Sequence, residues 1–100
     1  MNTIPACRIT IIAEALLEDR LIRDVKTCGA KGYTVTQVHG EGTRGVRASQ
    51  WEGGNIKLET IVSETVADLI LEMVANKYFQ HFAVIAYLET VAVVRGEKYL

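Results

Sequence analysis

The chain has 100 residues, a formal net charge of −1 and a hydrophobic fraction of 49%, which fits one domain with a modest core. The near-neutral charge lacks the basic excess expected of a nucleic-acid-binding protein. We find no apolar run of the roughly 18 residues that would span a bilayer and no features of a secretory signal, so we expect a cytoplasmic protein without membrane insertion.

The first half of the chain predicts a strand, a helix and a second strand. Residues 7–14, after a short leader that ends at Pro5, are rich in β-branched side chains and partly alternate, as in a strand. Over residues 15–28 apolar side chains recur every three or four positions and charged ones fill the opposite side, which predicts a helix stopped by Gly29. Residues 33–39 alternate again and predict the second strand.

The second half predicts a strand, a helix and a last strand. Residues 55–62 alternate clearly and should pair antiparallel to residues 33–39. Thr65 can start a helix as the first residue of a capping-box variant, and helical spacing continues to about Tyr78. Residues 82–94 are continuously apolar and β-branched, which favours a long, mostly buried strand over a third helix.

The predicted order of elements is βαββαβ, the order of the ferredoxin-like sandwich. In this α+β fold two helices cover one face of a four-stranded antiparallel sheet, because the crossovers are right-handed. The other face is left uncovered, and the strands here, above all residues 82–94, carry apolar side chains on both faces. We therefore predict that this uncovered face is buried against other subunits of an oligomer.

A glycine-rich segment, residues 40–54, connects the second and third predicted strands. Its glycines allow backbone N–H groups to turn toward an anion, and Thr43, Arg44 and Arg47 add donors. Such a segment can grip a phosphate or carboxylate, or it can be a solvated hairpin tip. Its length favours a functional role. Trp51 in the same segment predicts a partner contact or a loop anchor.

Cysteine and histidine, the residues most typical of zinc sites, are scarce. Cys7 and Cys28 form no C-x-x-C pair, and both histidines, His39 and His81, are distant in sequence. We therefore predict no metal site and no disulfide. Both cysteines are expected to behave as small buried hydrophobic residues, with a redox role as the alternative.

Four short motifs occur in an order that carries a family resemblance. They are Gly29-Ala30-Lys31-Gly32-Tyr33-Thr34-Val35, Gly42-Thr43-Arg44-x-Val46-Arg47-x-Ser49, Asn55-Ile56-Lys57 and Lys77-Tyr78-Phe79. Together they cover nearly the whole chain, and they resemble the PII signalling proteins. More specifically, the chain is similar to the PII-like proteins of the SbtB type, whose close relatives are encoded with carboxysomes.

The resemblance implies that residues 1–100 form a single PII-like domain that assembles as a homotrimer. Such a protein is a regulator, not an enzyme, and has no catalytic residues. It senses an adenine nucleotide (AMP, ADP, ATP or cyclic AMP) in clefts between subunits, and bicarbonate is a proposed second ligand. The segment at about 40–54, called the T-loop, engages a partner. In the SbtB case this is a sodium-dependent bicarbonate transporter, which would bring the protein to the membrane and into the carbon-concentrating mechanism.

The resemblance also implies which residues bind the nucleotide. The base of the T-loop would hold the phosphate oxygens, and the backbone at the start of the last strand would contact the adenosine. A basic residue of the tail would reach a neighbouring subunit's cleft or lie exposed. Val84 departs from the family pattern, which has a glycine there, and narrows the approach to the base. The assigned residues are Gly40, Gly42, Thr43, Arg44, Arg47, Ala83, Val84 and Arg95.

Two other function classes stay open. A small ferredoxin-like enzyme would need an acid and a base, for which Glu14, His39 and Glu59 are the candidates, although no nucleophile accompanies them at motif spacing. A trimeric metal-tolerance protein of similar architecture would need ligand side chains, and Cys, His and Met are few.

Overall fold

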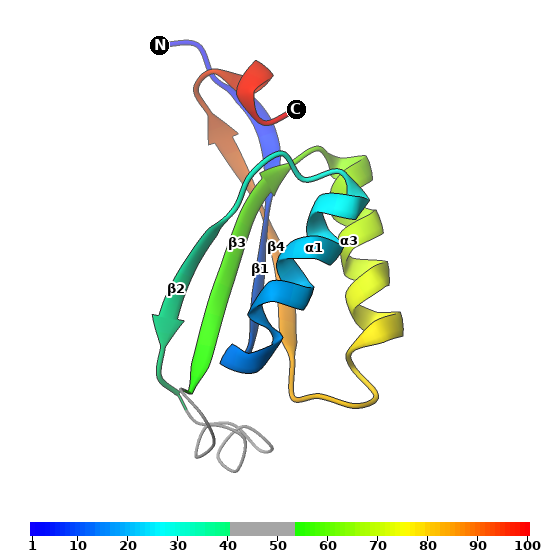
Figure 1. The fold of residues 1–100 in the computed structure, drawn as a ribbon. Helices are drawn as coiled ribbons and strands as arrows, with labels where there is room; N and C mark the ends of the chain where they lie inside the picture. The colour runs from blue at the N-terminus through cyan, green and yellow to red at the C-terminus, as the bar shows by residue number, and fades with distance from the viewer. Residues whose placement is uncertain (41–53) are drawn as a thin grey trace.

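The computed structural model describes residues 1–40 and 54–100. These form a sandwich of two layers, a four-stranded sheet and a pair of helices that lie on the same face of it (Figure 1). The elements are β1 (Ile4–Glu14), η1 (Ala15–Leu17), α1 (Glu18–Cys28), β2 (Thr34–Val38), β3 (Asn55–Val62), α3 (Glu64–Lys77), β4 (Ile85–Val93) and η2 (Gly96–Lys98). Neither helix in the described part of the chain is long and apolar enough to cross a membrane.

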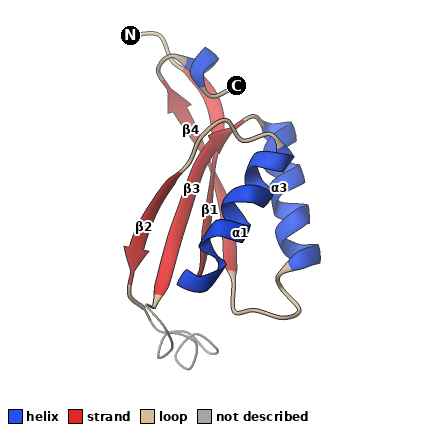
Figure 2. Ribbon diagram, in the orientation of Figure 1, coloured by secondary structure: helices blue, strands red, loops and turns tan. Residues whose placement is uncertain are grey.

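The sheet has the strand order β2-β3-β1-β4, and every neighbouring pair is antiparallel (Figure 2). The longest strand, β1, is central, so that Ile9 lies opposite Thr60 on β3 and opposite Leu88 on β4. This arrangement confirms the predicted βαββαβ order and the ferredoxin-like α+β fold. The predicted pairing of the second and third strands is confirmed as well.

The core lies between the sheet and the two helices. Alternate residues of β1 and β3 point into it, and the apolar stripes of α1 and α3 close it from the other side. Each fully buried Leu, Ile or Val side chain contributes about 1.5–3 kcal/mol relative to an exposed one. The core residues with no exposed surface are Ile9, Ile11, Leu21, Val25, Leu58, Ala67, Ile70, Val74 and Tyr78.

The predicted bounds of the first strand and the first helix differ from those in the structure. Strand β1 begins at Ile4, so Pro5 is part of the strand and lies opposite Ala92 of β4. Pairing with β3 begins only at Cys7, so the missing N–H of Pro5 removes no bond on that side. The predicted helix over 15–28 is split, because a 3₁₀ turn, η1, precedes α1.

The second helix is capped by Ser63 and not, as predicted, by Thr65. Ser63 has extended backbone angles, and its hydroxyl oxygen accepts a hydrogen bond of 3.2 Å from the N–H of Val66. The last strand also starts later than predicted, at Ile85, because residues 78–84 form the connection between α3 and β4.

The prediction of a mostly buried last strand is wrong for the single chain. Ile85 and Tyr87 are 56% and 45% exposed. Their positions opposite Ile12 and Thr10 place both on the face of the sheet that the helices leave uncovered, called the open face below. None of the residues that the structure describes covers these two side chains fully.

The open face also carries charge. Arg8 lies opposite Glu89, and its Nη2 is 2.7 Å from a carboxylate oxygen of Glu89. The Nε of Arg8 is 3.9 Å from Glu59 on the other neighbouring strand. The open face therefore combines apolar side chains of β4 with polar and charged ones, among them Lys57 opposite Ile12.

Candidate functional site

The ends of several elements meet at one end of the sheet. Val38, Asn55 and Glu14 lie side by side in the strand register, and Ile85 enters the sheet two residues away from that row, opposite Ile12. The N–H of Ala15 donates a hydrogen bond of 2.9 Å to the carbonyl of Gly54. This bond ties the base of the T-loop to the end of β1.

The structure places some of the predicted nucleotide-binding residues at the same end of the sheet, but on its opposite edges, with β3 and β1 between them. Gly40 follows β2 at this end of the sheet, and the connection that contains Ala83 and Val84 lies at the same end (Figure 1). Both Ala83 and Val84 are half-buried, whereas Gly40 is exposed. The predicted residues Gly42, Thr43, Arg44 and Arg47, and the predicted partner contact Trp51, lie outside the described residues.

Arg95 is not near this group. It follows β4 at the opposite end of the sheet, close to the start of β1, which pairs with the end of β4. Its backbone is left-handed, with φ of 61°, and its side chain is exposed. Within one chain, therefore, Arg95 lies at the opposite end of the sheet from Gly40 and Val84.

The connection between α3 and β4, residues 78–84, is held by its own backbone. The carbonyl of Tyr78 accepts hydrogen bonds from the N–H groups of His81, at 3.1 Å, and Phe82, at 2.9 Å. The N–H of Val84 donates to the carbonyl of Phe82 at 3.0 Å. The N–H of Val84 is thus already satisfied inside the connection.

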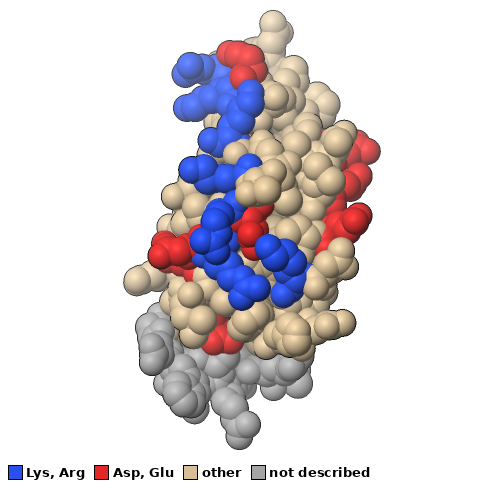
Figure 3. Space-filling view, turned by 45° about the vertical axis from the view of Figure 1, so that its right-hand side comes forward, with Lys and Arg blue, Asp and Glu red and all other residues tan. Residues whose placement is uncertain are grey.

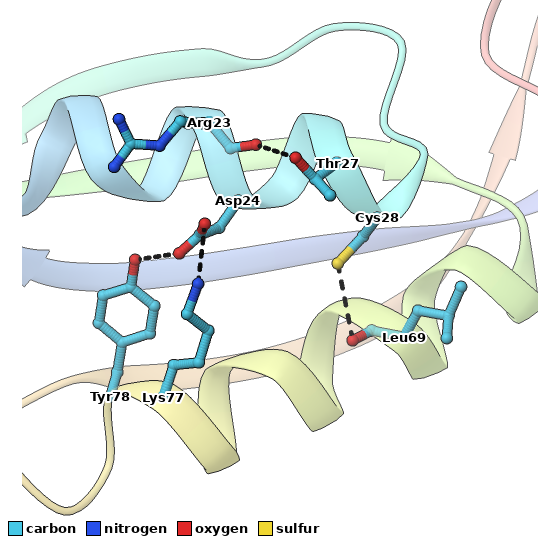
Figure 4. A network of polar contacts seen from close by, with 7 residues as sticks. All are labelled: Arg23, Asp24, Thr27, Cys28, Leu69, Lys77 and Tyr78. Carbon is cyan, nitrogen blue, oxygen red and sulfur yellow. Dashed lines mark hydrogen bonds and ion pairs between the residues drawn. The ribbon is translucent and has the colours of Figure 1, made fainter.

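A buried polar cluster links this connection to α1 (Figure 4). The Tyr78 hydroxyl donates a hydrogen bond of 2.5 Å to Oδ2 of Asp24, and Lys77 Nζ donates one of 3.1 Å to Oδ1. Burial raises the pKa of Asp24, but the donors on Tyr78 and Lys77 outweigh it and leave that pKa below its usual value. Burial, together with the bond to Asp24, raises the pKa of Tyr78 well above its usual value.

Cations surround this carboxylate. The guanidinium carbon of Arg20 lies 4.9 Å from the centre of the Tyr78 ring and 5.6 Å from that of Phe82, a cation–π arrangement. Arg23 and Lys77 are exposed nearby. Lys and Arg side chains form a band down this face of the molecule, with Asp and Glu side chains beside the band and at the edges of the face (Figure 3).

The cluster was missed by sequence analysis, which predicts that Asp24 faces solvent like the other charged residues of α1. In the structure Asp24 is only 8% exposed. A signal was present, because Asp24 stands next to Val25 and three residues after Leu21, on the edge of the buried stripe. A carboxylate at such a position needs donors, but the sequence does not say which.

The residues considered for other chemistry are buried to different degrees. Cys7 is buried, as predicted, and Cys28 is half-buried, where burial raises the pKa of its thiol. Glu14 ends β1 and is half-buried, and His39 is exposed after β2. Within residues 1–40 and 54–100, His, Cys, Asp and Glu form no group of three or more placed to hold a metal ion.

Comparison with known families identifies the fold and the class of protein. The family model described as nitrogen regulatory protein P-II matches residues 6–98. This chain belongs to the P-II family. It is therefore a PII-like regulatory protein, which confirms the resemblance at the level of the family.

Individual P-II relatives support this assignment. A PII-like signalling protein from Thermus thermophilus has 59% identity and a TM-score of 0.88, with all of both chains covered. CPII from Thiomonas intermedia K12, solved with ADP and bicarbonate, has a TM-score of 0.86 over 99% of this chain and 98% of its own, but only 21% identity, and so shares the fold. The nitrogen regulatory protein GlnK2 of Haloferax mediterranei is 31% identical in an alignment 74 residues long, which covers 62% of this chain and 60% of GlnK2.

Proposed function

We propose that this chain forms a homotrimer that binds an adenine nucleotide in clefts between subunits, with bicarbonate as a second ligand. The observation that carries the proposal is that the T-loop base and residues 78–84 lie at the same end of the sheet, on its two opposite edges, in a chain that belongs to the P-II family. CPII, which has the same fold, was solved with ADP, AMP and bicarbonate bound. The binding of these ligands by the present chain is the proposal.

The trimer rests on the open face. Ile85 and Tyr87 lie there with more than 40% of their surface exposed, and Val91 continues the same row on β4. Glu89 interrupts this row, but exposed apolar side chains gathered on one face in this way favour burial against another subunit. A trimer also accounts for Arg95, because the opposite end of one sheet can meet the T-loop end of a neighbouring chain, and Arg95 would then add a cation to that neighbour's cleft.

The ligand would join two parts of the site. Gly40, Gly42 and Thr43, together with Arg44 and Arg47, supply backbone and side-chain donors for phosphate oxygens. The backbone of Ala83 and Val84 contacts the adenosine. A nucleotide that binds both parts changes the surface that the T-loop presents, so that ligand binding is converted into a choice of partner.

The free energy of phosphate binding is too small to order the whole T-loop by itself. Each charge-assisted hydrogen bond contributes about 1.5–3 kcal/mol, whereas fixing one residue of backbone costs about 1–2 kcal/mol. A few such bonds offset the entropy cost of ordering a few residues but not that of ordering the whole T-loop. A second ligand or a partner surface therefore has to supply the remaining stabilisation. Bicarbonate suits this role, because its two unprotonated oxygens form a planar, carboxylate-like group that matches a bidentate arginine.

The partner that fits these ligands is a bicarbonate transporter of the membrane or a carboxysome-associated protein. A regulator that binds both a nucleotide and bicarbonate can report energy state and inorganic carbon together. The motifs quoted for the SbtB type support this narrower assignment, in which the protein is cytoplasmic and reaches the membrane only through its partner. Trp51 on the T-loop is the residue we assign to the partner contact.

Calorimetry on the purified chain tests the proposal. AMP, ADP, ATP and cyclic AMP are titrated separately, each with and without bicarbonate. We expect at least one nucleotide to bind and its affinity to rise with bicarbonate. Absence of binding heat for all four nucleotides at millimolar concentration would overturn the nucleotide-sensing function. If a nucleotide binds with the same affinity in the presence and absence of bicarbonate, only the proposal that bicarbonate is a second ligand is overturned.

A further inference from the structure

A path of hydrogen bonds runs from α1 to the start of β4. Asp24 accepts from the hydroxyl of Tyr78 at 2.5 Å. The carbonyl of the same Tyr78 accepts from the N–H groups of His81 and Phe82, and the carbonyl of Phe82 accepts from the N–H of Val84 at 3.0 Å. Tyr78 therefore joins its side-chain bond to α1 with the backbone turns that lead to Val84.

The packing around Tyr78 restricts its alternatives. Its side chain has no exposed surface, and its ring centre lies 6.0 Å from that of Phe82. The guanidinium of Arg20 caps both rings from α1, and Lys77 holds the second oxygen of Asp24 at 3.1 Å. A tyrosine held at its hydroxyl, its ring and its carbonyl can turn only if several of these contacts break together.

These bonds matter because they lie next to the backbone assigned to the adenosine. That backbone belongs to Ala83 and Val84, which lie one to three residues beyond the two N–H groups that Tyr78 fixes. Contacts made through backbone atoms depend on where the backbone stands, since no side chain can reorient to compensate. A displacement of residues 78–84 would thus directly change the backbone contacts to the adenine base.

We propose that Asp24 and Tyr78 are positioning residues of the nucleotide site, which hold residues 78–84 from α1 and thereby set both the affinity for the nucleotide and the discrimination between purine bases. This inference rests on the proposed function. It goes further in giving a role to two buried residues that do not contact the ligand. The simpler view is that the pair only stabilises the fold, and the test is chosen to separate the two.

The test compares Tyr78→Phe with Thr60→Val in the full chain. Thr60 is 2% exposed and donates a hydrogen bond of 2.6 Å to the carbonyl of Gly32, toward the end of the sheet away from the T-loop. Both substitutions delete one buried hydroxyl and its bond. Urea unfolding measures the loss of stability in each variant, and calorimetry with ADP and with GDP measures affinity and the ratio between the two bases.

We expect Tyr78→Phe to weaken ADP binding about tenfold, which is one decade of affinity, and to bring the ADP and GDP affinities closer together. Thr60→Val should lose stability while keeping both the affinity and the ratio. Asp24→Asn keeps an oxygen that can accept from Tyr78, so it should fall between wild type and Tyr78→Phe, and it replaces Tyr78→Phe if that variant does not fold.

The outcomes separate the two claims. If wild type binds ADP and both Tyr78→Phe and Asp24→Asn match it in affinity and in the ratio, the positioning role is overturned and the proposed function stands. If Thr60→Val shifts the ratio as much as Tyr78→Phe, the effect is one of general stability and the positioning role is again overturned. If wild type binds no nucleotide, the proposed function fails and the positioning role fails with it.

Discussion

Tyr78 and Asp24 are 54 positions apart in the chain, yet the hydroxyl of one lies 2.5 Å from the carboxylate of the other. An O–H···O⁻ distance this short is typical of a charge-assisted hydrogen bond. Because both side chains are buried, water cannot replace either partner when the other is removed. The pair therefore joins α1 to the end of α3 more firmly than the neighbouring ion pair with Lys77, whose side chain is 48% exposed.

Removing the hydroxyl should destabilise the protein. We expect Tyr78→Phe to lower the free energy of unfolding by about 1.5–3 kcal/mol, the range for hydrogen bonds to charged groups. Lys77→Met should cost about 0.2–1 kcal/mol, because a solvated ammonium gains little from its partner. Urea unfolding of both variants at one protein concentration measures the difference. Equal losses would contradict this ranking.

Asp24 should make stability depend on acid. The folded protein holds this carboxyl's pKa below the ordinary value of 3.8, so the folded state binds the proton less tightly than the unfolded chain. The stabilisation is therefore complete above that ordinary value and is lost as pH falls through the folded pKa. We expect the stability advantage of wild type over Asp24→Asn to be constant above about pH 5 and to shrink as the pH is lowered into the range below 3.8. Urea unfolding across that range measures it, and a constant difference would contradict the assignment.

Gly29 should resist substitution, unlike the nearby Gly32. Gly29 ends α1 with φ of +121°, and an added Cβ would lie 3.1 Å from a methyl of Val66. Gly29→Ala should therefore cost about 1–3 kcal/mol through backbone strain. At Gly32 an added Cβ meets nothing within 4 Å, so Gly32→Ala should stay within about 0.5 kcal/mol of wild type. Thermal unfolding of both variants measures the difference in stability between them. A Gly29→Ala variant as stable as wild type would contradict the prediction.

A charge on the open face should separate the subunits. Tyr87→Glu would bury a carboxylate wherever another chain covers β4, at a cost of several kcal/mol. We expect light scattering to give the mass of three 11.1 kDa chains for wild type and a smaller mass for the variant. Leu69→Glu is the control, because Leu69 is 50% exposed on α3, in the helix layer. Loss of assembly in both variants would contradict the choice of face.

The T-loop arginines should carry the phosphate contacts. Arg44→Ala and Arg47→Ala are each expected to weaken ADP binding more than about tenfold, since 1.4 kcal/mol corresponds to one decade. Lys26→Ala removes an exposed charge from α1 and should leave the affinity unchanged. Calorimetry at constant ionic strength compares the three. Wild-type affinity in both arginine variants would refute the phosphate assignment.

The sequence predicts best where a local pattern decides the structure. The alternation of Ile56, Leu58 and Thr60 predicts both the extent of β3 and the face that is buried. It predicts less well where two residues are equally suited. Ser63 and Thr65 are both good caps, and only the observed extended angles of Ser63, with ψ of 164°, select it.

Two features needed the tertiary structure. The apolar run of β4 predicts burial, but composition cannot say whether the covering surface belongs to the same chain, and the described residues leave Ile85 more than half exposed. The pairing of Asp24 with Tyr78 joins two helices far apart in sequence, and no local pattern encodes it. For the site, the order of the elements was enough to place Gly40 and Val84 at one end and Arg95, which follows the last strand, at the other, whereas the position of β2 and β4 on opposite edges of the sheet needed the structure.

The ion pair between Arg8 and Glu89 has a consequence for what can cover the open face. A surface that met this face with apolar side chains alone would strip water from these charges and return no hydrogen bond. In the proposed trimer, the neighbouring subunit would therefore have to leave the pair in contact with water or bring polar groups to it. The pair would thus act against any partner surface that is complementary in shape alone.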